Sequence, residues 1–274
     1  VVAGIARVVT AAADPDPRVC GRGHAILRRA GIEVLEGLMS DLAFEDLAGY
    51  LVRTIRKRPH VSLKLAVSAD GMIGRRDGGQ IAITGPVSRG QVHVMRSQSD
   101  AILIGIGTAL EDDPTLTCRL PGLEDRSPIR IVLDRDLRLP ADSKLASTAG
   151  KVPVWIAARP DADPERRAVL AAAGCRILAT EMHEGRIALP ELLDDLAAEG
   201  LSRVMVEGGA ATAAAFLAEG LVDQIGIFEG PIEIGREAGV AAPDLAPYLA
   251  DFVAAGKASF GEDRYTEYLR PLKV

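Results

Sequence analysis

The sequence has few cysteines and no long hydrophobic run. Its 274 residues include 3 cysteines, Cys20, Cys118 and Cys175, which are far apart and form neither a CxxC pair nor a disulfide framework. This usage is typical of a reducing cytoplasm. The apolar runs are interrupted by glycine, proline or charge, and they stay well short of the ~20 residues that a membrane helix requires. We therefore expect a cytoplasmic protein without a membrane span.

Excess basic charge is also missing. The chain has 32 Lys and Arg residues against 38 Asp and Glu, which gives a net charge of -6. Nucleic-acid binding requires a basic face, so no nucleic-acid partner is expected. The four histidines, His24, His60, His93 and His183, lack the spacing of a metal site, and no nucleophile elbow is present. We expect no metal, and individual arginines to bind any anionic ligand.

The composition itself is that of a globular protein. Hydrophobic residues make up 48% and charged residues 26% of the chain, which excludes disorder and fibrous repeats. The first nine residues contain neither an initiator Met nor the basic region of a signal peptide. We therefore expect the chain to begin inside a longer protein.

A basic stretch, Arg56-Lys57-Arg58-Pro59, is the best domain boundary, because the proline favours extended geometry at the residue before it. It predicts one domain over residues 1–57 and a second over 58–274. The first is short. It has a strand pattern at 6–9, a helix at 25–30, a strand at 32–35 and apolar residues at helical spacing over 41–55.

The second segment alternates short apolar runs with amphipathic helical patterns. This alternation predicts a largely parallel sheet with helices on both faces, an α/β class typical of nucleotide-binding proteins. The predicted strands are 61–67, 101–104, 129–133, 152–157, 176–179, 204–206 and 224–228, and the predicted helices are 88–98, 163–173, 189–198 and 211–219.

Ligands bind outside the carboxyl ends of the strands in such sheets, so polar residues at strand ends are the candidates for a site. Lys64 interrupts an apolar strand and needs a partner or a ligand if it is buried, although an edge-strand lysine pointing at water is an equal alternative. Gly105 and Gly107 follow the next strand, where exposed amides can meet phosphate, and the adjacent acids Asp112 and Asp113 come after them.

Two further strand ends carry candidate residues. Glu207-Gly208-Gly209 separates a strand from a helix start, where free amides favour an anion such as a dinucleotide phosphate, or simply make a tight turn. Arg89 and Arg96 share one face of the helix that follows Thr84-Gly85. That face suits a phosphate, but a solvated surface is favoured for Arg89.

Taken in order, several motifs resemble the reductase part of the bifunctional riboflavin-biosynthesis deaminase/reductase family. They are Val61-Ser62-Leu63-Lys64, Ser68-Ala69-Asp70-Gly71, Ile83-Thr84-Gly85, Arg96 with Asp100 to Leu103, Gly107-Thr108, Asp112 to Arg119, and Val206 to Gly209. The resemblance spans Arg58 to Val274, and the DDPTLTCR stretch, Asp112 to Arg119, is its most specific part.

The resemblance implies a dihydrofolate reductase-like fold and NADPH as hydride donor. It implies a phosphorylated pyrimidine ribosylamine as substrate, whose ribose is reduced to ribityl, and a homodimer. Carried over residue by residue, it places cofactor contacts at Ala66, Thr108, Asp112, Gly208, Gly209 and Ala210. It places substrate contacts at Thr84, Arg96, Leu116, Arg119 and Glu207, with Lys64 and Glu207 as the candidate catalytic residues.

The N-terminal segment resembles the closing third of the same family's cytidine deaminase-like domain. The resemblance rests on residues 5–9, 14–23 and 27–34. The zinc-binding motifs of that domain do not occur in this chain, so zinc is expected only in the absent part of the domain, and deamination only from the full-length protein.

One departure from the family concerns Gln80 and Ala82, which stand where many members have Ser and Trp. A stacking surface for the cofactor or substrate is therefore missing. Two alternatives remain open. One is a dihydrofolate reductase-like enzyme acting on another pteridine or pyrimidine, and the other is a non-catalytic nucleotide-binding module.

Overall fold

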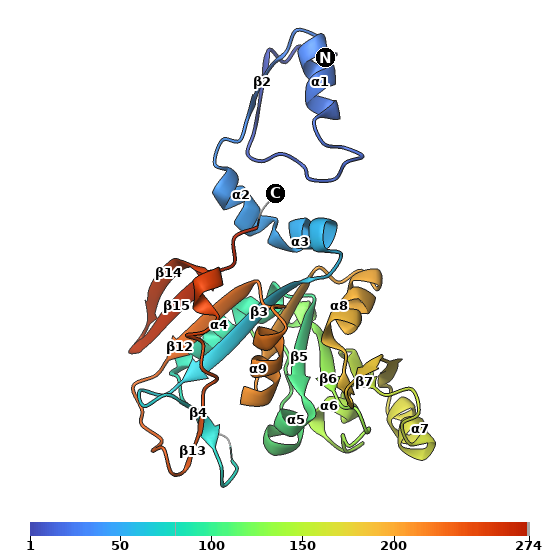
Figure 1. The fold of residues 1–274 in the computed structure, drawn as a ribbon, viewed down its shortest axis with the longest axis vertical. Coiled ribbons are helices and arrows are strands. Elements are labelled where there is room, and N and C mark those ends of the chain that lie inside the picture. Colours follow the sequence, from blue (N-terminus) through green and yellow to red (C-terminus); the bar gives the residue numbers. More distant parts are fainter. Residues whose placement is uncertain (80, 273–274) are drawn as a thin grey trace.

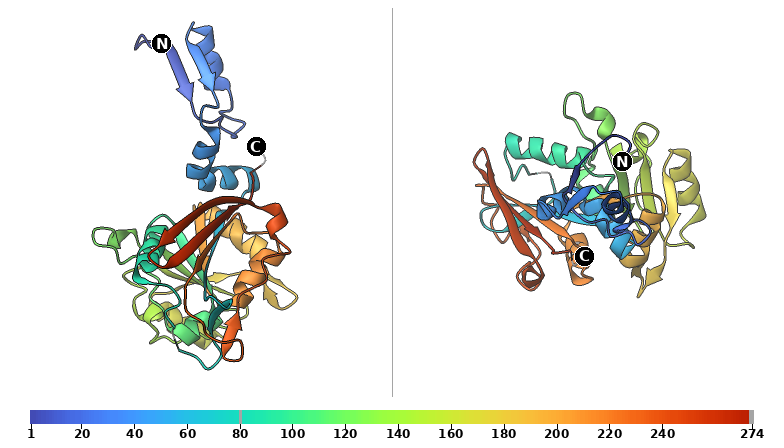
Figure 2. Two further views of the ribbon diagram at one scale, coloured as in Figure 1. Left: turned by 90° about the vertical axis from the view of Figure 1, so that its left-hand side faces the viewer. Right: turned by 90° about the horizontal axis from the view of Figure 1, so that it is seen from above.

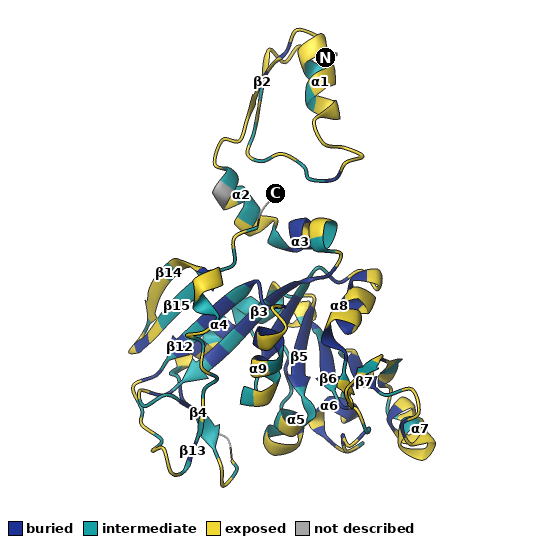
Figure 3. Ribbon diagram, in the orientation of Figure 1, coloured by how far each residue is buried: buried dark blue, intermediate teal, exposed yellow. Residues whose placement is uncertain are grey.

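The computed structural model describes residues 1–79 and 81–272. Its N-terminal segment pairs two short parallel strands, β1 (Arg7–Thr10) and β2 (Glu33–Glu36), joined through helix α1 (Arg22–Arg29). This unit projects away from the rest of the molecule (Figures 1 and 2). It leaves apolar side chains such as Val9, Ile26 and Leu35 exposed. The segment therefore buries little core of its own (Figure 3).

The single helical pattern over residues 41–55 forms two helices, α2 (Ser40–Asp46) and α3 (Ala48–Arg56), with a break at Leu47. The break turns α3 so that Leu51 and Val52 are buried. Gly49 then packs against Arg203, whose side chain donates a 2.6 Å hydrogen bond to the carbonyl of Asp46. Tertiary contact with the body of the protein thus overrides the local periodicity.

A nine-stranded sheet forms the centre of the second segment, in the order β14-β15-β12-β3-β11-β5-β6-β7-β8. Seven strands are parallel, and β14 and β15 extend the sheet in antiparallel fashion beyond β12. The parallel strands are β3 (His60–Val67), β5 (Ala101–Gly105), β6 (Ile129–Leu133), β7 (Val154–Ala158), β8 (Arg176–Ala179), β11 (Arg203–Glu207) and β12 (Gln224–Glu229), and the others are β14 (Val253–Phe260) and β15 (Asp263–Leu269).

Helices cover both faces of this sheet. Helices α8 (Leu189–Ala198) and α9 (Ala210–Ala218) pack on the face seen from the front in Figure 1. The opposite face packs against α5 (Ile106–Asp112), α6 (Lys144–Ser147), α7 (Pro164–Ala172) and Met95 of α4 (Pro86–Ser97). The two apolar layers bury the central strands on both sides, which accounts for their continuous apolar sequences.

The N-terminus of α4 is capped from a distant hairpin. Buried Asp263, the first residue of β15, accepts a 2.7 Å hydrogen bond from the Gly85 amide and a 2.5 Å bond from the Ser88 hydroxyl. These bonds satisfy donors at the helix start, where Gly85 offers no side chain. The orientation of α4, which carries two arginines toward the functional site, is thereby tied to the β14–β15 edge.

The predicted α/β class and the predicted strands and helices of this segment are confirmed to within two residues. Several other elements were not predicted from the sequence. They include α5, the hairpin β14–β15, and the short pairs β4 (Met72–Arg75) with β13 (Gly239–Ala241) and β9 (Met182–His183) with β10 (Arg186–Ile187). Among the helices described, none is long and apolar enough to cross a membrane.

Candidate active site

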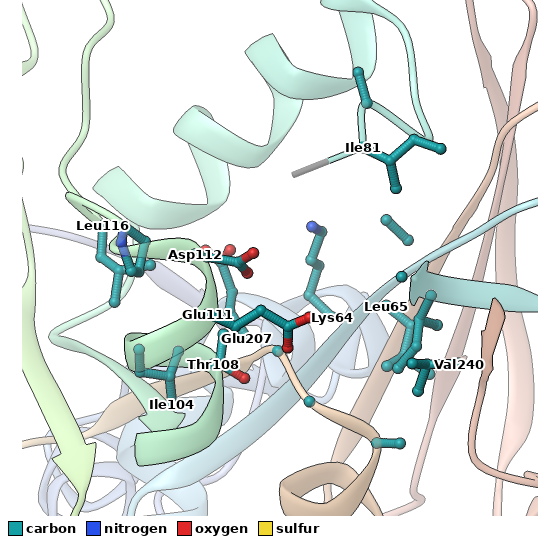
Figure 4. Close-up of a pocket in the computed structure, with 18 of the residues that line it drawn as sticks. Lys64, Leu65, Ile81, Ile104, Thr108, Glu111, Asp112, Leu116, Glu207 and Val240 are labelled. Atoms are coloured by element: carbon teal, nitrogen blue, oxygen red, sulfur yellow. The ribbon is translucent and has the colours of Figure 1, made fainter. Parts of the chain in front are cut away.

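A cleft of about 630 Å³ opens at the carboxyl ends of β3, β5 and β11. Helix α4, the glycine turn after β11, α5 and the β4–β13 pair supply its walls (Figure 4). A smaller cavity of about 320 Å³ continues from it and shares Arg96, Pro114, Leu116 and Arg119 with the main cleft. Lys144 and Asp113 line this second cavity. The site therefore has a large chamber and a smaller one that is lined by three cations and by Asp113, which pairs with Lys144 at 3.6 Å.

A buried ion pair lies at the base of the cleft. Arg96 of α4 donates from Nε to Glu207 Oε1 at 2.8 Å and from Nη2 to Oε2 at 2.9 Å. Both side chains are about nine-tenths buried, at 11% and 10% exposure. Such a two-pronged contact fixes the orientation as well as the charge of both groups. Arg96 also donates to the Thr117 carbonyl at 3.2 Å, which joins the pair to the loop after α5.

Lys64 stands beside this pair. Strand register places Lys64 of β3 directly across from Glu207, the last residue of β11, so the two side chains leave the sheet on the same face. In the part of the chain that the structure describes, no carboxylate lies within 4.0 Å of the Lys64 ammonium. Its nitrogen points into the open space of the cleft (Figure 4). The alternative of an edge lysine pointing at water is thus wrong, because β3 is a central strand.

The three charges shift one another's pKa values. Burial opposes ionisation of Glu207, but Arg96 and then Lys64 outweigh it and lower the pKa of the carboxyl. Burial lowers the pKa of Lys64, and Glu207 offsets this only in part. Glu207 therefore remains a carboxylate, whereas Lys64 holds its proton less tightly than an ordinary lysine. A loosely held proton beside a fixed carboxylate suits proton transfer.

The glycine turn after β11 brings two helix starts together. A Cβ on Gly208 would lie 2.9 Å from Thr108 Cγ2, and one on Gly209 would lie 2.9 Å from Thr108 Oγ1. Gly208 also has a φ of 106°, which only glycine adopts readily. Among the described residues no side chain caps the start of α9, and Gly208, Gly209 and Ala210 line the cleft there. This turn has the room and the donors that a phosphate requires.

The DDPTLTCR loop forms the opposite wall of the cleft. Asp113 and Leu116 hold positive φ values of 39° and 53°, which are uncommon for residues with side chains. Leu116 is nevertheless buried, and Arg119 donates to Thr115 Oγ1 at 2.6 Å. Burial, followed by the neighbouring Glu111, raises the pKa of Asp112. The loop is therefore held in an unusual conformation next to the site.

The cleft collects most of the residues expected from the sequence. Those that line it are Lys64, Ala66, Arg96, Thr108, Asp112, Leu116, Arg119, Glu207, Gly208, Gly209 and Ala210. Thr84 does not line it. Its carbonyl instead accepts a 2.6 Å bond from Arg89. Ala82 lies on the cleft wall, whereas Gln80 lies outside the described residues.

Some lining residues were missed from the sequence. Arg89, for which a solvated surface was favoured, is exposed, but it also lines the cleft together with Arg96. The helix face that the two arginines share was the available signal. Arg75 and Glu111 also line the cleft, but no local pattern distinguishes them from surface charges. Within residues 1–79 and 81–272, no three His, Cys, Asp or Glu side chains gather as metal ligands.

Comparisons with known proteins agree with this geometry. The family model described as the RibD C-terminal domain matches residues 59–258. The riboflavin biosynthesis protein RibD of Bacillus amyloliquefaciens is 37% identical over 243 residues, which cover 88% of this chain and 63% of that protein. The chain thus spans somewhat less than two thirds of that relative.

Solved structures give the same result. RibD of Acinetobacter baumannii superimposes with a TM-score of 0.83 at 30% identity, covering 99% of this chain and 74% of that one. A Thermotoga maritima diaminohydroxyphosphoribosylaminopyrimidine deaminase/5-amino-6-(5-phosphoribosylamino)uracil reductase gives a TM-score of 0.80 at 26% identity, covering 98% and 73%. These structures confirm the predicted dihydrofolate reductase-like α/β fold with a mainly parallel sheet. By sequence and by fold, the chain belongs to the RibD C-terminal domain family.

Proposed function

We propose that this chain reduces the ribosyl group of 5-amino-6-(5-phosphoribosylamino)uracil to the ribityl form with NADPH, in riboflavin biosynthesis. The observation that carries the proposal is the Lys64–Glu207–Arg96 arrangement at the base of a cleft with a glycine turn on one side. The name of the Thermotoga relative includes this reductase activity.

The residues present fit a dinucleotide on the glycine side of the cleft. Gly208, Gly209 and Ala210 leave backbone amides at the start of α9 for phosphate oxygens. Thr108 and Asp112 of α5, together with Ala66, complete this wall. NADPH bound here would supply a hydride to the substrate.

The substrate fits the opposite side. Arg119, whose only side-chain partner in the described part of the chain is Thr115, lies where the main chamber meets the smaller one. With Lys144, which also pairs with Asp113 at 3.6 Å, it offers that chamber cations for a phosphate monoester. Leu116 and Arg96 line both chambers, so they would lie between the substrate's phosphate and the ribose carbon that is reduced. The pyrimidine ribosylamine would thus extend from the small chamber toward Lys64.

Lys64 and Glu207 handle the charge that develops on reduction. Opening of the ribosylamine ring yields an imine between C1' and the exocyclic nitrogen, and C1' then accepts the hydride. Lys64 donates a proton to that nitrogen, which balances the added electron pair. Glu207 accepts hydrogen bonds from sugar hydroxyls while its pair with Arg96 keeps it in place. The protein contributes position and electrostatics rather than a covalent intermediate.

We further propose that residues 1–57 are the end of a deaminase domain and residues 58–274 the reductase domain. In the full-length protein, zinc would belong to the deaminase domain, as the paired activities named for the Thermotoga relative suggest. We propose a cytoplasmic location, in keeping with the three free cysteines. The active form is proposed to be a homodimer.

A substrate panel tests the proposed function. The chain should oxidise NADPH with the deaminated ribosylaminopyrimidine and produce one ribityl product per NADPH. Oxidation with a dihydropteridine instead would favour a dihydrofolate reductase-like role. Binding of NADPH without consumption would favour a non-catalytic nucleotide-binding module.

A further inference from the structure

Arg130 is a fully buried cation without an acidic partner. It is the second residue of β6 and has 0% exposure. In the part of the chain that the structure describes, no carboxylate lies within 4.0 Å of its guanidinium, and its Nε has no hydrogen-bond acceptor. Burial lowers the pKa of Arg130 to about 10, so it remains charged at neutral pH. An unpaired buried charge destabilises a fold.

The guanidinium is instead surrounded by backbone acceptors from two loops. Nη1 donates to the Thr115 carbonyl at 3.3 Å and to the Thr148 hydroxyl at 2.7 Å. Nη2 donates to the Thr148 carbonyl at 3.1 Å and to the Val152 carbonyl. Thr115 lines the smaller cavity beside the cleft, whereas Thr148 and Val152 belong to the loop after α6.

The Thr115 carbonyl belongs to the peptide bond that joins Thr115 to Leu116. Leu116 has a φ of 53°, a conformation that costs about 1 to 3 kcal/mol and persists only where its surroundings impose it. A bond to this carbonyl restricts rotation of the peptide plane and therefore the φ of Leu116. Three residues later, Arg119 leaves the same loop toward the junction of the two chambers.

Further anchors of the loop attach at other points. The Cys118 amide donates to Ser127 Oγ at 3.1 Å and the Arg119 amide to His93 Nδ1 at 3.3 Å. Arg96 reaches the Thr117 carbonyl from the site at 3.2 Å, and Asp113 accepts a 2.8 Å bond from the Lys144 amide at the start of α6. Arg130 also binds Thr148, the C-cap of α6. One guanidinium thus connects both the loop and the helix that supports it to the central sheet.

We propose that Arg130 is a positioning residue for the reduction: it fixes the Thr115–Leu116 peptide and so places Leu116 and Arg119 on the substrate side of the cleft. This inference rests on the proposed function.

The test replaces Arg130 by methionine in the full chain, with the exposed Arg126→Met as matched control. Met has similar volume but leaves the Thr115, Thr148 and Val152 carbonyls without their donor, so R130M should melt below the wild-type temperature. Its KM for the ribosylamine should rise about tenfold with kcat and NADPH affinity little changed. Amide hydrogen exchange should accelerate in residues 115–119 and 148–152, the two segments that Arg130 bonds, and not elsewhere in the sheet. R126M should match the wild type in each measurement.

The outcomes separate the two proposals. If wild-type protein consumes no NADPH, the proposed function fails, whereas exchange in residues 115–119 still tests the role of Arg130. Unchanged exchange in residues 115–119, or faster exchange throughout the sheet, would overturn the positioning role. Should R130M not fold, R130K keeps the charge but loses the paired donors, and the same local exchange with a raised KM is expected. An unchanged KM and unchanged exchange in R130K would also overturn it.

Discussion

Arg96 and Glu207 are 111 positions apart in the chain, yet their side chains meet in a two-pronged ion pair at 2.8 and 2.9 Å beneath the cleft. The pair connects α4 to the end of the central strand β11, and strand register places Lys64 next to it. These three residues are the chemical centre of the proposed site.

Glu207→Gln tests this centre directly. The amide keeps the shape but loses the charge, so Arg96 is left buried without compensation, and we expect the free energy of unfolding to fall by about 3 kcal/mol. Turnover should fall at least about 100-fold with NADPH affinity nearly unchanged. Glu199→Gln is the matched control, because its pair with Arg176 is 48% and 40% exposed. Denaturant unfolding should show little change for E199Q, because exposed ion pairs contribute little to stability. An equal effect of both variants would argue against a special role for Glu207.

Lys64 should determine the alkaline limb of the pH–rate profile. Burial lowers its pKa from 10.5, with Glu207 opposing in part. The ammonium that the proposed step needs is therefore lost as pH rises through a value below 10.5. We expect kcat to decline at alkaline pH in the wild type, and Lys64→Met to lower kcat about 100-fold and abolish that limb. Retention of the limb in K64M would assign it to another group.

Gly208→Ala should weaken cofactor binding. The new Cβ would lie 2.9 Å from Thr108 in a backbone with φ of 106°. Titration should show NADPH affinity reduced at least about tenfold. Gly200→Ala provides the control, because Gly200 has a φ of 99° but nothing within 4 Å and lies outside the cleft. G200A should lose stability from backbone strain while its NADPH affinity stays at the wild-type level, and a comparable loss of affinity would contradict the assignment.

His60 should make the fold sensitive to acid. Burial, the largest effect, lowers its pKa from 6.5 to about 4. Between these values the unfolded chain binds a proton that the folded chain does not, so stability falls as pH decreases. The contribution amounts to about 3 kcal/mol by pH 4. Urea unfolding of the wild type and of His60→Gln at pH 7 and pH 4 isolates the contribution of His60 to the free energy of unfolding. The wild type should lose more stability between the two pH values than the variant. Equal losses would show that His60 does not titrate differently on folding.

The central sheet could be predicted because its strands are buried on both faces and therefore read as continuous apolar runs. The β14 strand could not be predicted, since almost all of its residues are exposed and several are small. Helix α5 was missed because it has 7 residues, contains Gly107 and starts without a side-chain cap. Local sequence patterns carry little information about such elements.

The candidate site was predicted residue by residue, but its geometry was not. The pairing of Arg96 with Glu207 and the approach of Thr108 to the glycine turn depend on strand order, which no local pattern contains. Arg130 interrupts an apolar run in the sequence as Lys64 does, but the sequence analysis did not single it out. The structure shows that Lys64 lines the cleft, whereas Arg130 is buried and bonds the Thr115 carbonyl. The division of the chain at Lys57 and Arg58 remains a prediction.

Transfer of deuterium from labelled NADPH is the sharpest test of the proposed reduction at C1' of the substrate. The chain is incubated with the ribosylaminouracil phosphate and NADPH carrying deuterium at both C4 positions of the nicotinamide, and the product is analysed by mass spectrometry and NMR. We predict one deuterium per product molecule, located on C1' of the ribityl chain, with one NADPH consumed for each. Unlabelled product, or NADPH that binds without being consumed, would contradict the account.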